Sequence, residues 1–238
     1  MSGTSSQSTA HTIVALDFSS SDAALDFVAT VNPEICKVKV GFELFINSGP
    51  QVVKDLIDRD FDVFLDMKLH DIPNTVAAAC ERACELGVWM LNIHATGGLP
   101  MMLAAKQAVN SANPQTKLLA VTILTSLDNQ DLNDLGINKN LEEQVISLAM
   151  KAKESELDGV VCSANEAKRI KSACGSNFIV VTPGIRLEAS KIRSEDQKRV
   201  VTPKEAAESG SDFVVVGRPV INSSNPIETI KHINSFFN

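Results

Sequence analysis

The chain has 238 residues, a formal net charge of −7 at neutral pH and 44% hydrophobic residues. An acidic chain lacks the basic face that nucleic acids and anionic membranes bind, so we expect neither as a partner. No apolar run approaches the roughly 20 residues that cross a bilayer, and residues 1–10 lack the basic and apolar regions of a secretory signal. We therefore predict a cytoplasmic protein with a disordered tail over residues 1–10 and a folded domain over residues 11–238.

Eight apolar, β-branched runs recur along the chain with helical stretches between them. They lie at residues 12–16, 35–40, 61–68, 89–94, 117–123, 159–162, 178–182 and 213–216. Strands that alternate with helices form parallel sheets, and eight such units in a chain of this length are most economically a closed barrel. Because no linker rich in proline or glycine divides the chain, we predict an α/β fold, a single-domain (β/α)8 TIM barrel.

Charged residues stand where the first two of these strands end. The first run leads to Asp17, and the second contains Lys39, which strand alternation directs inward while Val38 and Val40 face the helices. Taken singly, Asp17 and Lys39 would more often be rim charges than catalysts. In a barrel, however, the loops at the carboxyl ends of the strands converge on one cavity, so both are candidate substrate-binding residues.

The third run carries the most informative stretch, FDVFLDMKLHDIPNT over residues 61–75. The strand period of two places Asp66 and Lys68 on one face at the carboxyl end, and Asp71 follows just beyond the strand. An Asp and a Lys two residues apart at a strand end are usually a solvated pair. The full stretch is far more specific than that pair, and it predicts a cluster of two acids and a lysine at the mouth of the barrel.

The fourth and fifth runs add a histidine and two hydroxyl groups. The fourth ends at His94, and the fifth leads to Thr125 and Ser126, which can bind a base or a ribose. A histidine at a strand end can bind a metal with Asp66 as a second ligand. No second His or Glu stands at ligand spacing, however, and Lys68 places a competing cation in the same area. We therefore expect no metal.

The last third of the chain predicts an anion site. Barrels commonly bind phosphate in the loops after strands seven and eight. Arginine grips phosphate oxygens in pairs, and glycine lets a backbone N–H approach them. The seventh run leads into TPGIR, the eighth ends in GR, and the long polar stretch between them suits a lid. The candidate residues of this part of the chain are Pro183, Arg186, Gln197, Gly217 and Arg218.

The chain has five cysteines, at positions 36, 80, 84, 162 and 174. Cys80 and Cys84 lie one helical turn apart, a spacing that could form a metal or redox pair. Each cysteine sits among Ala, Val or Leu residues, as small buried thiols do in a reducing cytosol. We therefore predict buried, unreactive thiols.

The motifs from about His11 to the C-terminus resemble those of one family. They are ALDF, KVG, FLDMKLHDIPNT, NIHATGG, VTILTS, TPGIR, DQKRVVTP and VVVGRP, in that order. The chain is similar to orotidine 5'-phosphate decarboxylases of the bacterial type. The resemblance implies decarboxylation of orotidine 5'-monophosphate to uridine 5'-monophosphate, the last step of de novo UMP biosynthesis, by a homodimer that needs no cofactor. One departure is Leu187, which stands where the family pattern has proline, in a charge-rich loop over residues 187–196.

The resemblance also implies roles for individual residues. Lys68 is the proton donor to C6, and it forms an alternating charge array with Lys39, Asp66 and Asp71. Asp71 and Thr75 are supplied across the dimer interface. Asp17 and Lys39 bind the ribose, and Thr125 and Ser126 lie near the base. The phosphate side is bound by Pro183, Arg186, Gln197, Gly217 and Arg218.

The chemistry gives these residue types a physical reason. Loss of CO2 from C6 leaves an electron pair in an sp2 orbital that the π system of the ring cannot absorb. Without a cofactor, the protein must supply fixed charge where the carbanion grows. A lysine ammonium can stabilise the anion and then protonate it, and the flanking carboxylates of Asp66 and Asp71 favour the charged form of Lys68.

Two alternatives remain open. One is a magnesium-dependent sugar-phosphate decarboxylase or aldolase of the same barrel superfamily, which shares the D-x-K-x-x-D strand but typically has an upstream Glu as a metal ligand and lacks the IPNT continuation. Activity that is insensitive to EDTA would exclude it. The other is a phosphate-binding barrel that has lost catalysis, although every charged position of the array is present.

Overall fold

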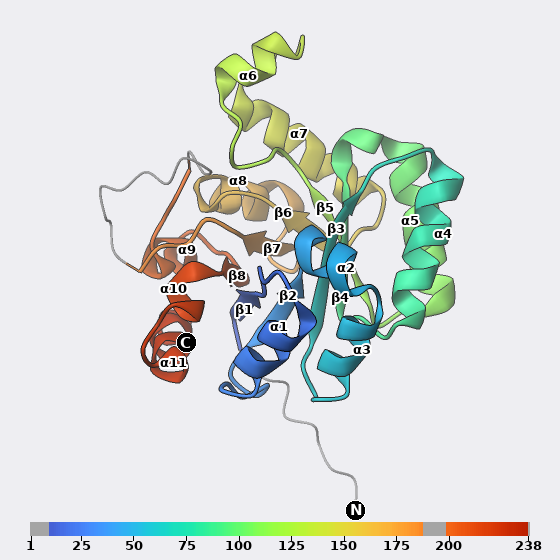
Figure 1. Cartoon of the computed structure of the whole chain (residues 1–238). Helices are drawn as coiled ribbons and strands as arrows, with labels where there is room; N and C mark the ends of the chain where they lie inside the picture. The colour runs from blue at the N-terminus through green and yellow to red at the C-terminus, as the bar shows by residue number, and fades with distance from the viewer. Residues whose placement is uncertain (1–9, 188–198, 238) are drawn as a thin grey trace, which may run out of the picture.

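The computed structural model describes residues 10–187 and 199–237. Its eight strands are β1 (Thr12–Ala15), β2 (Lys37–Val40), β3 (Val63–Leu69), β4 (Met90–His94), β5 (Lys117–Val121), β6 (Gly159–Val161), β7 (Ile179–Thr182) and β8 (Phe213–Val216). Every strand pairs in parallel with its neighbour in sequence, and β1 also pairs with β8 to close the barrel (Figure 1). The predicted barrel is confirmed. Residues 1–9 of the predicted tail lie outside the described residues, and Ala10 is buried.

Helices cover the outside of this barrel (Figure 1). They are α1 (Ser21–Val28), α2 (Phe42–Ser48), α3 (Gln51–Ile57), α4 (Pro73–Glu85), α5 (Leu99–Ala112), α6 (Asn129–Asp134), α7 (Leu141–Glu154), α8 (Ala164–Cys174), α9 (Pro203–Glu208), α10 (Arg218–Ile221) and α11 (Pro226–Asn234), with a 3-10 turn at Ala95–Gly97. Several helices begin at a residue whose side chain caps the first turn. In α9, for example, the Thr202 hydroxyl accepts a hydrogen bond from the N–H of Glu205. In the described ranges, no helix has both the length and the apolar character to cross a bilayer.

Strand alternation sorts the apolar residues into two layers. Phe64, Met90 and Leu119 belong to the core inside the barrel. Val38 and Val40 belong to the larger core between barrel and helices, which directs the intervening Lys39 inward as predicted. The barrel interior therefore has an apolar core, and the inward lysines Lys37 and Lys39 lie on either side of it.

The lower end, where the strands begin, is closed by a buried lysine. Lys37 also points into the barrel, and its Nζ lies 2.5 Å from Asp62 Oδ2 and 4.5 Å from the centre of the Trp89 ring. Phe213 packs edge-on against Trp89 and completes this plug. The amine thus has an acid and an aromatic face as partners, and the opposite end of the barrel is left to form a site.

Strand β3 departs from regular geometry where its charged residues begin. The register with β4 shifts between Leu65 and Leu69, and Lys68 has φ of +43°. This is the left-handed region, which is strained for a non-glycine residue. The strand continues to Leu69, one residue past its predicted end, and Asp66 and Lys68 both line the pocket, on the face that strand alternation predicts.

Candidate active site

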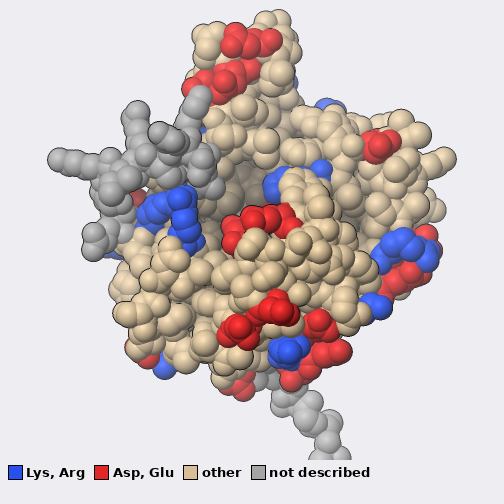
Figure 2. Space-filling model, in the orientation of Figure 1, with Lys and Arg blue, Asp and Glu red and all other residues tan. Residues whose placement is uncertain are grey.

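A pocket opens at the carboxyl ends of the strands (Figure 2). Its floor is the upper part of the barrel core, including Ala15, Phe64 and Val215. Every strand except β4 contributes a lining residue, either from its own end or from the loop that follows. Figure 2 shows basic side chains on two sides of the hollow and acidic ones along its lower rim. The pocket is therefore apolar at its floor and charged at its mouth, as in other (β/α)8 barrels with active sites at this face.

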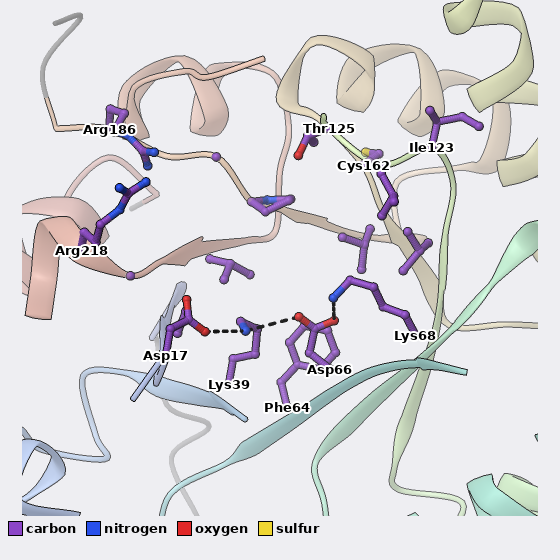
Figure 3. A pocket seen from close by; sticks show the side chains of 18 residues that line it. Asp17, Lys39, Phe64, Asp66, Lys68, Ile123, Thr125, Cys162, Arg186 and Arg218 are labelled. Carbon is purple, nitrogen blue, oxygen red and sulfur yellow. Dashed lines mark hydrogen bonds and ion pairs between the residues drawn. The ribbon is translucent and has the colours of Figure 1, made fainter. Parts of the chain in front are cut away.

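Four side chains along one side of the pocket alternate in charge (Figure 3). Lys39 Nζ lies 3.3 Å from Asp17 Oδ1 and 3.3 Å from Asp66 Oδ2, and Lys68 Nζ lies 2.7 Å from Asp66 Oδ1. The side chain of Asp17 is 60% exposed, whereas those of Lys39 and Asp66 are each 11% exposed. The array therefore runs from the solvated rim into a region where water screens the charges little.

Asp66 is the centre of this array. Burial alone would raise the pKa of its carboxyl group, but the charges of Lys39 and Lys68 and the hydrogen bonds from Lys68 and Asn92 together hold that pKa below its usual value. Asn92 Nδ2 donates to Asp66 Oδ1 over 2.7 Å. Asp66 therefore stays ionised, and both of its oxygens have charged partners.

Lys68 is held through its backbone as well as its amine. Its N–H donates to Asn92 Oδ1 over 2.7 Å, so one amide fixes both the backbone of the lysine and the carboxylate beside it. The Nζ also lies 5.3 Å from the centre of the Phe42 ring. A residue in a strained conformation that its surroundings hold in place is common at catalytic centres, because the strain fixes the direction of a functional group.

A glycine allows the close approach of Lys39. A Cβ at Gly41 would lie 2.9 Å from Lys39 Nζ, so a side chain at this position would displace the amine from where it lies. Gly41 therefore leaves room for the amine at the point where α2 begins.

Two arginines stand on the other side of the pocket. Arg186 follows β7 and Arg218 opens α10 after β8, and Figure 3 shows the ends of their side chains facing each other across the pocket from Lys68. Pro183 and Gly184 turn the chain between β7 and Arg186, with Gly184 at φ +82°. The pocket therefore has a positively charged end opposite the charge array.

The predicted residues fall into three groups. Those that line the pocket are Asp17, Lys39, Asp66, Lys68, Thr125, Pro183, Arg186, Gly217 and Arg218. Three others, Ser126, Asp71 and Thr75, are exposed and do not line the pocket of their own chain. Asp71 Oδ1 accepts from the N–H of Ile72 over 2.6 Å. Gln197 and most of the loop over residues 187–196 lie outside the described residues.

His94 and the cysteines show no ligand arrangement. The ring of His94 lies 5.6 Å from that of His70, and burial, followed by the nearby His70 and Lys68, lowers its pKa. In the two described ranges, no three His, Cys, Asp or Glu side chains gather as a metal would require. All five cysteines are free and buried, as predicted, and burial raises the pKa of Cys80 to about 12.

Asn92 was not identified as a candidate site residue from the sequence. This residue is fully buried and makes the two hydrogen bonds that organise Asp66 and Lys68. A signal was present, because strand alternation from His94 places Asn92 on the inward face of β4. An inward amide in a barrel interior needs polar partners, and the adjacent strand β3 carries Asp66 and Lys68 on its inward face.

Comparison with known proteins gives a consistent result. Residues 11–233 match the family model described as Orotidine 5'-phosphate decarboxylase / HUMPS family. The chain is 52% identical over 223 residues to the orotidine 5'-phosphate decarboxylase of Pseudoalteromonas translucida (strain TAC 125), covering 93% of this chain and 94% of the relative. It is 54% identical over 219 residues to that of Legionella pneumophila (strain Corby), covering 92% and 95%.

A solved structure agrees with these sequence matches. The crystal structure of orotidine 5'-phosphate decarboxylase from Lactobacillus acidophilus superposes with a TM-score of 0.85 at 38% identity, over 95% of this chain and 98% of that one. The sequence motifs, the barrel and the charged pocket thus agree with the family match over nearly the whole chain. The chain belongs to the Orotidine 5'-phosphate decarboxylase / HUMPS family.

Proposed function

We propose that this chain decarboxylates orotidine 5'-monophosphate to uridine 5'-monophosphate and CO2 without a cofactor, as the last step of de novo UMP biosynthesis. The observation that carries the proposal is the Lys39–Asp66–Lys68 array at the mouth of the barrel, with two arginines across the pocket from it. A nucleoside monophosphate has a dianion at one end and a base at the other, which matches a pocket with these two ends. The relatives at 52% and 54% identity carry the name of this activity.

Lys68 is the proposed proton donor. When the bond between C6 and the carboxylate breaks, CO2 leaves and the electron pair stays on C6. The Lys68 ammonium stabilises this pair and then gives up a proton to form the new C6–H bond. The direct ion pair with Asp66 supports the assignment, because it holds the amine of Lys68 in place at the edge of the pocket.

The remaining pocket residues bind and orient the substrate. Asp17 and Lys39 are the proposed ribose ligands, and Thr125 is the proposed contact for the base together with Ser126. Arg186 and Arg218 grip the phosphate, with Pro183, Gly217 and Gln197 on the same side. Binding energy from the phosphate end can position the base against Lys68, although the phosphate takes no part in the bond that breaks.

We further propose that the active enzyme is a homodimer in which Asp71 and Thr75 complete the partner's pocket. Two observations support this. Both residues are exposed and lie outside the pocket of their own chain, and the neighbouring Ile72 is 67% exposed. An exposed isoleucine between two polar residues suits a surface that another copy covers.

A mixing experiment tests the shared site. Lys68→Ala and Asp71→Ala chains are each expected to be nearly inactive as homodimers. In a mixed dimer, one site receives Lys68 from one chain and Asp71 from the other, so activity should return on mixing. If both residues acted within one chain, no site in the mixture would be intact and mixing would restore nothing.

One measurement decides between the proposed activity and its rivals. Orotidine 5'-monophosphate is added to the purified chain, and the loss of its absorbance is followed with and without EDTA. We expect turnover at the same rate in both. Turnover that EDTA abolishes would favour a metal-dependent reaction of the HUMPS kind, the second name in the family description. No turnover together with intact UMP binding would indicate a barrel that binds phosphate without catalysis.

We place this activity in the cytoplasm. Five buried free thiols without a disulfide suit a reducing compartment.

A further inference from the structure

Two walls of the pocket are formed by loops that lie far apart in sequence. The loop after β5 provides Ile123, Leu124 and Thr125, and the segment after β7 provides Gly184 and Arg186. In the proposed function these are the base side and the phosphate side. A substrate that contacts both walls requires them to stay at a fixed separation.

A buried ion pair lies behind the pocket and contacts one wall directly. Arg199 Nη1 pairs with Oε1 of Glu166, in the first turn of α8. Arg199 Nη2 donates to the carbonyl oxygen of Leu124 over 3.2 Å. The side chains of Arg199 and Glu166 are only 14% and 5% exposed. The guanidinium therefore joins α8 to the base-side wall from within the protein.

The backbone next to Arg199 contacts the other wall. The N–H of Val201 donates to the carbonyl oxygen of Gly184 over 3.2 Å, and the N–H of Arg186 donates to that of Val201 over 2.9 Å. These bonds form a short parallel bridge between Ile185 and Val201. Residues 199–201 therefore hold the phosphate-side wall through their backbone and the base-side wall through one side chain.

Stability alone gives little reason for this pair. Two charges removed from water are costly, and well-packed apolar residues often replace a buried ion pair without loss of stability. Burial raises the pKa of Glu166 in spite of the adjacent Arg199, which shows that its charged form is poorly solvated here. In the described residues, Glu166 Oε2 and Arg199 Nε have no hydrogen-bond partner, so the arrangement is not the two-bond fork that best stabilises such pairs.

We propose that Glu166 and Arg199 are positioning residues that set the separation between the base-side and phosphate-side walls of the pocket. The proposal rests on the proposed function, because that function assigns the two ends of a nucleotide to the two walls. Neither residue lines the pocket, so both act through Leu124 and Arg186 and not by contact with substrate.

The decisive variant replaces both charges by apolar side chains. In Glu166→Leu/Arg199→Leu no buried charge is left unpaired, so the melting temperature should stay within a few degrees of wild type, but the bond to the Leu124 carbonyl is lost. We expect kcat/KM for orotidine 5'-monophosphate to fall at least about tenfold. We also expect the preference for UMP over uridine, measured as a ratio of Kd values, to fall at least about fivefold, because only UMP reaches both walls.

A matched control separates this role from a structural one. Lys106 and Asp158 form an ion pair at the amino end of the barrel, with side chains 14% and 23% exposed, remote from the pocket. Lys106→Met should leave both kcat/KM and the UMP-to-uridine ratio within about twofold of wild type. The same result for the double leucine variant would overturn the proposal, since the pair would then be structural only.

The binding ratio also distinguishes this proposal from the proposed function. If the wild-type chain binds UMP more tightly than uridine but does not decarboxylate orotidine 5'-monophosphate, the proposed function fails. The effect of the double variant on that ratio would still support or overturn the positioning role. A single variant such as Arg199→Leu is less useful, because it leaves Glu166 buried without a partner and can unfold the chain.

Discussion

Strand β2 carries two inward lysines, one at each end of the barrel interior. Lys37 and Lys39 are 5% and 9% exposed, and they lie two residues apart on the same face. The two amines differ in their charged partners and in what lies beside them. Lys37 has one acid and the face of Trp89, which fill the lower end. Lys39 lies between Asp17 and Asp66, beside an open pocket.

This difference explains why identical side chains have different roles. At the lower end the charge of Lys37 is neutralised by Asp62, and its amine packs over the ring of Trp89, so this lysine contributes to closing the barrel. At the upper end each charge is shared among neighbours, and Lys68 at the end of the array keeps a side chain 26% exposed. Fixed charges at the edge of a cavity can act on a ligand without reorganising, which is the property that electrostatic catalysis requires.

The largest expected effect is at Lys68. In the proposed mechanism, Lys68→Ala removes both the charge that stabilises the carbanion and the proton that quenches it, so turnover should fall by at least about 10⁴-fold. UMP has no carboxylate at C6, and its binding should stay within about tenfold of wild type. Single-turnover decarboxylation and UMP titration measure the two quantities. Decarboxylation within about a hundredfold of wild type would refute the proton-donor assignment.

The next largest effect is at Arg218, on the phosphate side. If Arg218 binds the phosphate as proposed, Arg218→Ala should lower kcat/KM roughly 30- to 1000-fold, which corresponds to a loss of about 2 to 4 kcal/mol of transition-state stabilisation. The loss should be much smaller for orotidine, which has no phosphate. Arg169→Ala is the matched control, since this arginine on α8 is 53% exposed and pairs with Glu142 outside the pocket. A loss under tenfold at Arg218 would contradict its role in phosphate binding.

Much of this organisation could be predicted from the sequence. The barrel could be predicted from the repetition of apolar runs, because each run is long enough to form a strand and is separated from the next by helix-forming residues. The inward direction of Lys39 and the adjacency of Asp66 and Lys68 follow from the strand period alone. The position of Arg218 at the mouth of the pocket could also be predicted, because the loops at this end of a barrel converge on one cavity.

The rest depends on contacts that local patterns do not encode. Strand alternation can place Asn92 on the inward face, but its two partners, Asp66 and the Lys68 N–H, are known only once β4 is seen to lie beside β3. The bulge at Lys68 arises from the pairing of two strands and has no signature in β3 itself. Arg199 and Glu166 are separated by 33 residues, and nothing in their spacing indicates a pair.

A third prediction concerns the amide that joins β3 and β4. Asn92→Ala leaves the buried N–H of Lys68 without an acceptor and removes a donor from Asp66, so kcat should fall about 10- to 100-fold. Stability should fall by about 1 to 3 kcal/mol. Thr116→Val is the control, because it removes a buried hydrogen bond to the Val88 carbonyl before β4 begins. It should lower stability but leave kcat unchanged; equal losses of kcat in both variants would show that Asn92 acts only through stability.

The smallest effect on activity is expected at Lys37. Lys37→Met keeps most of the volume over Trp89 and leaves Asp62, whose side chain is 47% exposed, free to be solvated. Unfolding free energy should therefore change by less than about 2 kcal/mol, and kcat/KM by less than about twofold. Lys39→Met, two residues away on the same face, should lower kcat/KM at least about tenfold, because Asp66 then loses one of its two cations. Similar losses in both variants would mean that the interior responds as one electrostatic unit, and that the lower end is part of the site.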